Sequence, residues 1–94
     1  MEEKKIMGEF FNLLAKKPGM VAYGLKEVRE KLEQGFIDTL LLSESLPEET
    51  IEELEETAEK YSTRVVIISV ETNEGVQLKD IGGAAAILRF DTTK

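Results

Sequence analysis

The chain has 94 residues, contains neither histidine nor cysteine, and carries 12 basic and 19 acidic side chains for a net charge of −7. This length allows one domain with one core, and a composition of 41% hydrophobic and 33% charged residues is typical of a globular protein. The missing cysteines exclude disulfides and cysteine-ligated zinc. The acidic balance repels phosphate backbones, which argues against nucleic acid as a partner.

The apolar runs are too short to cross a membrane, and the N-terminus lacks the basic and then apolar segments of a signal peptide. We therefore expect a cytoplasmic protein with no membrane partner.

Apolar residues recur along the chain with helical and strand spacing in turn. The predicted elements are helices over 3–17, 25–34, 47–61 and 74–81 and strands over 20–23, 36–43, 64–70 and 84–90. This αβαβαβαβ order predicts an α/β domain, a three-layer sandwich with a four-stranded mixed sheet. Three successive leucines, 40–42, indicate a central strand covered on both faces. The β-branched strand 64–70 is also expected to be buried, and Tyr61 is expected to join the core stripe of the third helix.

Glycines mark several predicted turns. Gly24 lets the backbone turn into the second helix, and Gly35 suits the left-handed position after it. Gly75 opens the last helix, where amide groups could hold an anion, but TNEGVQ matches neither a phosphate loop nor a dinucleotide fingerprint. Gly82-Gly83 is expected to form a tight turn. A structural role is the favoured interpretation of these last three glycines.

The residue types do not favour catalysis. The two side chains that most often transfer protons or act as nucleophiles near neutral pH, histidine and cysteine, are missing. The glutamates of the third helix lie opposite its apolar stripe, so a solvated helix face explains them better than a carboxylate enzyme, the weakest of the hypotheses. The sequence predicts no enzyme activity and no cofactor.

The segment Gly24–Gly35, followed by an apolar strand ending in Ser43-Glu44, resembles the ribosomal-protein family that binds RNA kink-turns. That resemblance implies the same fold. The family presents an asparagine and a lysine to RNA where this chain has Lys26 and Glu30, and a carboxylate facing phosphate is repulsive. A kink-turn-type RNA-binding domain is thus an alternative, and direct RNA binding by this domain is disfavoured.

A second resemblance covers nearly the whole chain. Its three segments are EKKIMGEFF (3–11), YGLKEVREKLEQGFIDTLLLSESL (23–46) and NEGVQLKDIGGAAAILRF (73–90). They are similar to the C-terminal domain of archaeal-eukaryotic class I peptide chain release factors. The related ribosome-rescue factor Pelota shares the middle block and the AAILRF ending, and is the alternative assignment.

The resemblance implies a docking role in translation termination and no catalytic one. In this family the C-terminal domain binds the elongation-factor-type translational GTPase and later the ATPase that recycles ribosomes, and it meets the ribosome within the full-length factor. Residues 1–94 are then expected to form a single domain that lacks the subdomain usually inserted there. Only residues 45–49 stand in the place of that subdomain. The chain could be an excised domain or a compact standalone relative.

Candidate partner-binding residues lie on the first helix and near the last strand, where the resemblance implies the GTPase contacts. The first helix has a wider apolar stripe than one packing face needs. We expect its edge residues Met7 and Phe11 to be partly exposed for a partner, and the alternative is that the whole stripe lies in the core. Gly8 suggests a close approach by another backbone, because glycine inside a helix costs about 1 kcal/mol relative to alanine. Arg89 and Phe90 complete the set, although a paired structural arginine is an equal alternative for Arg89.

Overall fold

The computed structural model describes residues 2–91, with side chains described from Lys4 onward. The elements are α1 (Glu2–Lys16), the 3-10 helix η1 (Pro18–Met20), β1 (Val21–Tyr23), α2 (Leu25–Glu33), β2 (Ile37–Ser43), α3 (Glu48–Lys60), β3 (Arg64–Ile68), α4 (Asn73–Asp80) and β4 (Ala84–Leu88). The predicted alternation of helices and strands is confirmed. Pro18 and Gly19 end α1, as predicted, and form the short η1 turn that leads into β1.

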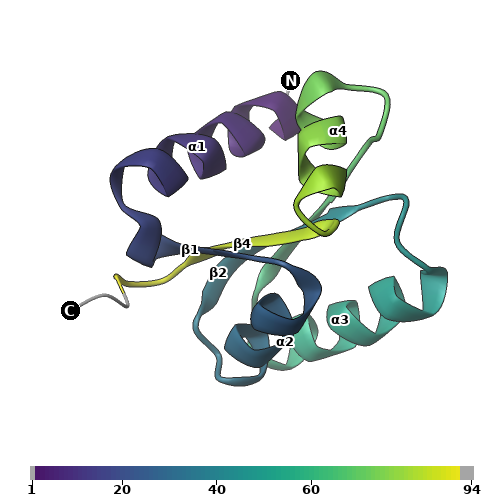
Figure 1. The fold of residues 1–94 in the computed structure, drawn as a ribbon. Coiled ribbons are helices and arrows are strands. Elements are labelled where there is room, and N and C mark those ends of the chain that lie inside the picture. Colours follow the sequence, from purple (N-terminus) through teal and green to yellow (C-terminus); the bar gives the residue numbers. More distant parts are fainter. Residues whose placement is uncertain (1, 92–94) are drawn as a thin grey trace.

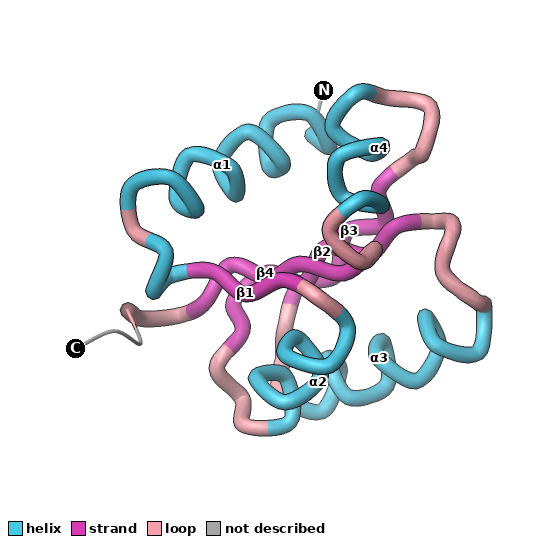
Figure 2. Tube along the Cα trace, in the orientation of Figure 1, coloured by secondary structure: helices cyan, strands magenta, loops and turns pink. Residues whose placement is uncertain are grey.

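The four strands form one mixed sheet in the order β1-β4-β2-β3. β2 and β3 are parallel, and β4 pairs antiparallel with both β1 and β2. Helices α1 and α4 cover one face of the sheet and α2 and α3 cover the other (Figures 1 and 2), so the predicted three-layer α/β sandwich is confirmed. No helix within residues 2–91 is long and apolar enough to span a bilayer.

The core lies on both sides of β2. Leu40 and Leu42 pack into the cluster beneath α2 and α3, and Leu41 packs into the cluster beneath α1 and α4. All three are fully buried. The alternating side-chain directions of a strand require this split, so a strand with successive leucines must be covered on both faces. The prediction of a central strand is confirmed.

β3 differs from the prediction in length and burial. It ends at Ile68, two residues before the predicted end, and Ile67 is 39% exposed. Only Ile68 within the strand is buried. The expectation of a buried strand is wrong because β3 is the last strand of the sheet, paired with β2 alone.

Two glycine turns, at Gly24 and Gly82, meet at one end of the sheet. Both have positive φ values, +90° and +112°, and a Cβ on Gly82 would lie 3.2 Å from the Cα of Gly24. Gly75 has a packing role, because a Cβ there would overlap the carbonyl oxygen of Ser69. Its amide donates to the Oγ1 of Thr72 at 2.9 Å, which caps the start of α4. These contacts agree with the structural interpretation of Gly75 and Gly82.

Two glycine-to-alanine substitutions should change stability in opposite directions. Gly75→Ala should lower the free energy of unfolding by about 3 kcal/mol, because the backbone of Ser69 must move to admit the methyl group. Gly8→Ala should raise it by about 0.5–1 kcal/mol, because nothing lies within 4 Å of a Cβ there and alanine is the better helix former. Urea unfolding of both variants measures the difference, and losses of equal size would contradict these environments.

Candidate docking surface

The apolar stripe of α1 faces the sheet and reaches α4. Met7 and Phe10 are fully buried in the cluster that contains Leu41, Ile68 and Leu78. The expected partial exposure of Met7 is therefore wrong. The stripe is wide because α1 packs against the sheet and also lies beside α4 (Figure 1), so the side chain predicted at its edge lies inside.

Phe11 lies at the edge of the packed face of α1, and Gly8 lies beside it on the exposed part of the helix. Phe11 is half-buried, and its ring meets the ring of Phe10 edge to face with centroids 5.2 Å apart. Gly8 is exposed and has open space around it, so no described part of this chain makes the close backbone approach that was expected there. Residues three apart share one helix face. Gly8 and Phe11 thus form a shallow, solvent-facing part of α1.

Arg89 follows the last residue of β4 and continues its pairing. Its amide donates to the carbonyl oxygen of Phe36 at 2.9 Å. Its guanidinium donates to the carbonyl oxygen of Tyr61 at 2.8 Å, where α3 has just ended. A cation at this position favourably meets the negative end of the helix dipole. Arg89 thus has the paired structural position that was the alternative for it, with an exposed side chain.

Phe90 is 47% exposed and packs on Phe36, edge to face, with ring centroids 5.0 Å apart. The ammonium of Lys31 lies 5.9 Å from the centroid of the Phe36 ring, within cation–π range. Tyr61 is 38% exposed beside these groups, linked to them through Arg89. We call Lys31, Phe36, Tyr61, Arg89 and Phe90 together the Phe90 surface.

Sequence reasoning identified Arg89 and Phe90 but missed the other members of the Phe90 surface. It placed Tyr61 in the core, whereas α3 ends at Lys60 and Tyr61 follows it as a partly exposed cap. The missed signal is position: Phe36, Tyr61 and Phe90 each stand just outside a regular element. Gly8 and Phe11 belong to α1, on the face of the sheet opposite α2 and α3 (Figure 1).

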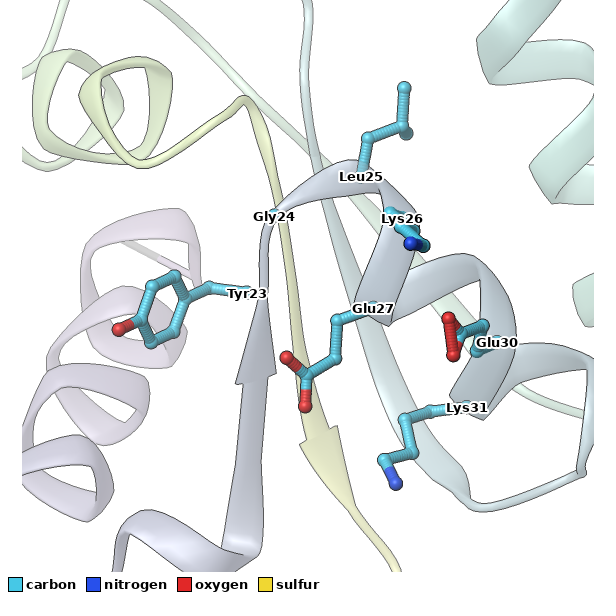
Figure 3. A pocket seen from close by; sticks show the side chains of 7 residues that line it. All are labelled: Tyr23, Gly24, Leu25, Lys26, Glu27, Glu30 and Lys31. Atoms are coloured by element: carbon cyan, nitrogen blue, oxygen red, sulfur yellow. The ribbon is translucent and has the colours of Figure 1, made fainter.

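A hollow at the start of α2 corresponds to the segment with the kink-turn resemblance (Figure 3). It is lined by residues from the end of β1 and from α2: Tyr23, Gly24, Leu25, Lys26, Glu27, Glu30 and Lys31. Its two lysines are matched by two glutamates, so the lining has no excess of positive charge to attract phosphate. The expectation that this domain does not bind RNA stays a prediction.

Within the described residues no three histidine, cysteine, aspartate or glutamate side chains gather as a metal site. The buried Ser43 has its hydroxyl 2.7 Å from that of Ser45 and accepts from the amide of Ser45 at 3.1 Å, so neither of these partners is a base. The arrangement of these residues thus defines a small α/β domain whose distinctive surface is aromatic and basic.

Comparison with known proteins identifies the class. The chain belongs to the family described as eRF1 domain 3, whose model matches residues 1–92. It is 37% identical to peptide chain release factor subunit 1 of Methanosphaera stadtmanae, over 96% of this chain and 32% of that protein. It is 42% identical to the Pelota homologue of Methanocaldococcus jannaschii, over 95% of this chain and 26% of that protein. The chain therefore spans about a third or less of these curated relatives.

Solved structures agree with the family and the fold. The C-terminal domain of the peptide chain release factor from Methanosarcina mazei superposes with a TM-score of 0.91 at 29% identity, covering 100% of this chain and 85% of that one. A model of ribosome-bound archaeal Pelota and ABCE1 matches at 38% identity and TM-score 0.83, over 98% of this chain and 27% of that one. Saccharomyces cerevisiae Dom34, a termination-like factor that interacts with Hbs1, matches at 26% identity and TM-score 0.87, over 99% of this chain and 28% of that one. The resemblance to release factors and Pelota is confirmed.

Truncating Met7 should destabilise the fold. Met7→Ala leaves a cavity between α1 and the sheet, and we expect the free energy of unfolding to fall by about 2–4 kcal/mol. Met7→Leu, which conserves volume, should cost less than about 1.5 kcal/mol. Urea unfolding distinguishes the two, and a negligible effect of Met7→Ala would show that Met7 is not packed in the core. A loss of partner binding in Met7→Asp would report on folding and so cannot test docking.

Proposed function

We propose that this chain is a non-catalytic docking domain of a translation termination or rescue factor. It binds a translational GTPase of the elongation-factor type and a ribosome-recycling ATPase. Membership of the eRF1 domain 3 family supports a role in translation termination or rescue. Two structural neighbours support the partners: Pelota with ABCE1 on the ribosome, and Dom34, which interacts with Hbs1.

The Phe90 surface carries this proposal. Protein interfaces concentrate their binding energy in a few aromatic and arginine side chains, and this surface combines a half-exposed phenylalanine with Tyr61 and Arg89. The Phe36 ring and the hydrogen bond of Arg89 to Tyr61 hold these groups in place, which reduces the conformational entropy lost on binding. Gly8 and Phe11 on α1 offer a second contact region, and Met7 acts only through packing beneath it.

The connection between β2 and α3 bears on which type of factor the chain represents. It consists of residues 44–47 alone. The alignment with the Methanosphaera stadtmanae release factor runs over 133 positions, far more than this chain contains, so the release factor holds residues with no counterpart here. Alignments with two Pelota homologues run over 90 and 93 positions. We assign the chain to the compact form that lacks the inserted subdomain, because its alignments with the Pelota homologues are nearly as long as the chain itself.

Phe90→Ala should weaken binding to an archaeal elongation-type GTPase at least tenfold without unfolding the domain, because it removes an exposed aromatic anchor. Tyr23→Ala is the matched control, since Tyr23 is 49% exposed and pairs with Ala85, away from the end of β4 where Phe90 lies. Titration calorimetry measures both affinities, and circular dichroism checks the fold.

The proposal is wrong if Phe90→Ala binds the GTPase as tightly as the parent chain, or if the parent chain does not bind it at all. Specific, salt-sensitive binding of kink-turn RNA by the parent chain would favour the RNA-binding alternative instead.

A further inference from the structure

Within residues 2–91 no strand pairs with the outer edge of β3, and an exposed apolar side chain, Ile67, lies on that edge. The order β1-β4-β2-β3 leaves β3 with a neighbour on one side only, on the far side of the sheet from β1 (Figure 2). β1 forms the other edge but has three residues, whereas β3 has five. Natural proteins usually protect such edges with charges, proline or a bulge, because the free backbone groups can pair with another strand. The sequence RVVII places none of these after Arg64.

The hydrogen bonds of the sheet identify which backbone groups are free. The carbonyl oxygen of Ile68 accepts from the amide of Glu44, so the backbone groups of Ile68 point toward β2. In a strand these directions alternate, so Val66 also points toward β2, and Val65 and Ile67 point outward. In the described part of the chain, no backbone hydrogen bond outside the ladder reaches Val65 or Ile67. Two residues thus offer donors and acceptors to an added strand.

The side chains of Val65 and Ile67 lie on the face that α3 covers. Their β2 partners, Leu40 and Leu42, belong to the cluster beneath α2 and α3. Ile67 remains 39% exposed although its partner Leu42 is fully buried. The exposed apolar surface of Ile67 therefore lies along the outer edge of β3, below the flank of α3.

That flank of α3 is a row of carboxylates. The ion pair between Arg29 and Glu53, at 3.2 Å, shows which side of α3 faces α2. The apolar residues of α3 face the sheet, and Glu53 faces α2. Helical periodicity therefore places another group of side chains on the remaining side of α3, above the outer edge of β3. This set is Glu48, Glu52, Glu55 and Glu59, all exposed. We call it the glutamate row.

We propose that the β3 edge binds an extended segment of another protein that alternates basic and apolar residues. The segment adds a strand beside β3 and bonds the free groups of Val65 and Ile67. Its lysine or arginine stems pack on Ile67 and their charged ends reach the glutamate row. This surface is separate from the Phe90 surface, and the inference does not depend on the GTPase or ATPase assignments.

Charge argues against a second copy of this chain as the occupant. Antiparallel pairing of two β3 edges about a two-fold axis perpendicular to the sheet would bring two glutamate rows to the same face, and each chain has a net charge of −7. Like charges in such proximity repel. A basic strand is attracted by the same carboxylates, so the charge of the glutamate row favours a segment of another protein over a second copy of this chain.

The test uses the whole chain and a ten-residue peptide that alternates lysine and valine, with a glutamate–valine peptide as control. Amide hydrogen exchange of the free chain should show Val66 and Ile68 protected and Val65 and Ile67 unprotected. The lysine–valine peptide should slow exchange at Val65 and Ile67 at least tenfold, and the glutamate–valine peptide should not. This readout needs no variant.

Two variants separate strand pairing from attraction to the helix. Ile67→Pro removes the outward amide, which the sheet does not use, and proline is tolerated at edge positions of this kind. It should abolish peptide binding while the chain stays folded. Glu55→Gln with Glu59→Gln should weaken binding about fivefold, whereas Glu49→Gln with Glu56→Gln, an equal change of charge on another side of α3, should not.

The proposal is overturned if the lysine–valine peptide leaves Val65 and Ile67 unprotected, or if folded Ile67→Pro binds it as tightly as the parent chain. It is also overturned if both peptides bind equally. Protection of these amides that rises with concentration of the chain alone would assign the edge to a second copy.

Discussion

The run of three leucines in β2 is the constraint on which the rest of the fold depends. Successive residues of a strand point to opposite faces, so Leu40 and Leu42 must be covered by one layer and Leu41 by another. Each buried leucine contributes about 2 kcal/mol relative to exposure, and neither layer can be removed without losing part of that contribution. The alanines of β4 beside β2 are small, which lets helices pack close to the sheet on both faces.

Several of the exposed apolar side chains lie where the layers end, and Val76 is exposed within α4. The stripe of α1 packs against the sheet and α4, with Met7 and Phe10 fully buried, and α3 presents glutamates outward. The remaining exposed apolar groups include Phe90 and Tyr61, just beyond the ends of elements, and Ile67 on the outermost strand. An acidic surface with a few exposed apolar groups suits selective contact with proteins, because the net negative charge of the rest of the surface suppresses nonspecific association.

Local patterns predicted the order and type of the elements, and the central position of β2 followed from its leucines alone. Three placements failed: those of Met7 and β3 because they depend on what packs beside the element, and that of Tyr61 because α3 ends one residue earlier than predicted. Periodicity showed the width of the α1 stripe but not that α4 lies beside it, so Met7 was expected at an edge. The predicted apolar stripe of α3 included Tyr61, but the helix ends at Lys60, one residue earlier. The sequence of β3 reads as buried, and only the strand order reveals that it has one neighbour.

Native-state hydrogen exchange of the chain tests most directly whether the leucines of β2 join both layers into one unit. The amides of Leu40, Leu41 and Leu42 should exchange only through global unfolding, and exchange in α1 and in α3 should merge with theirs as denaturant rises. If one helical layer opens while β2 and the other layer stay protected with the full free energy of unfolding, the two layers are independent and the central claim is wrong.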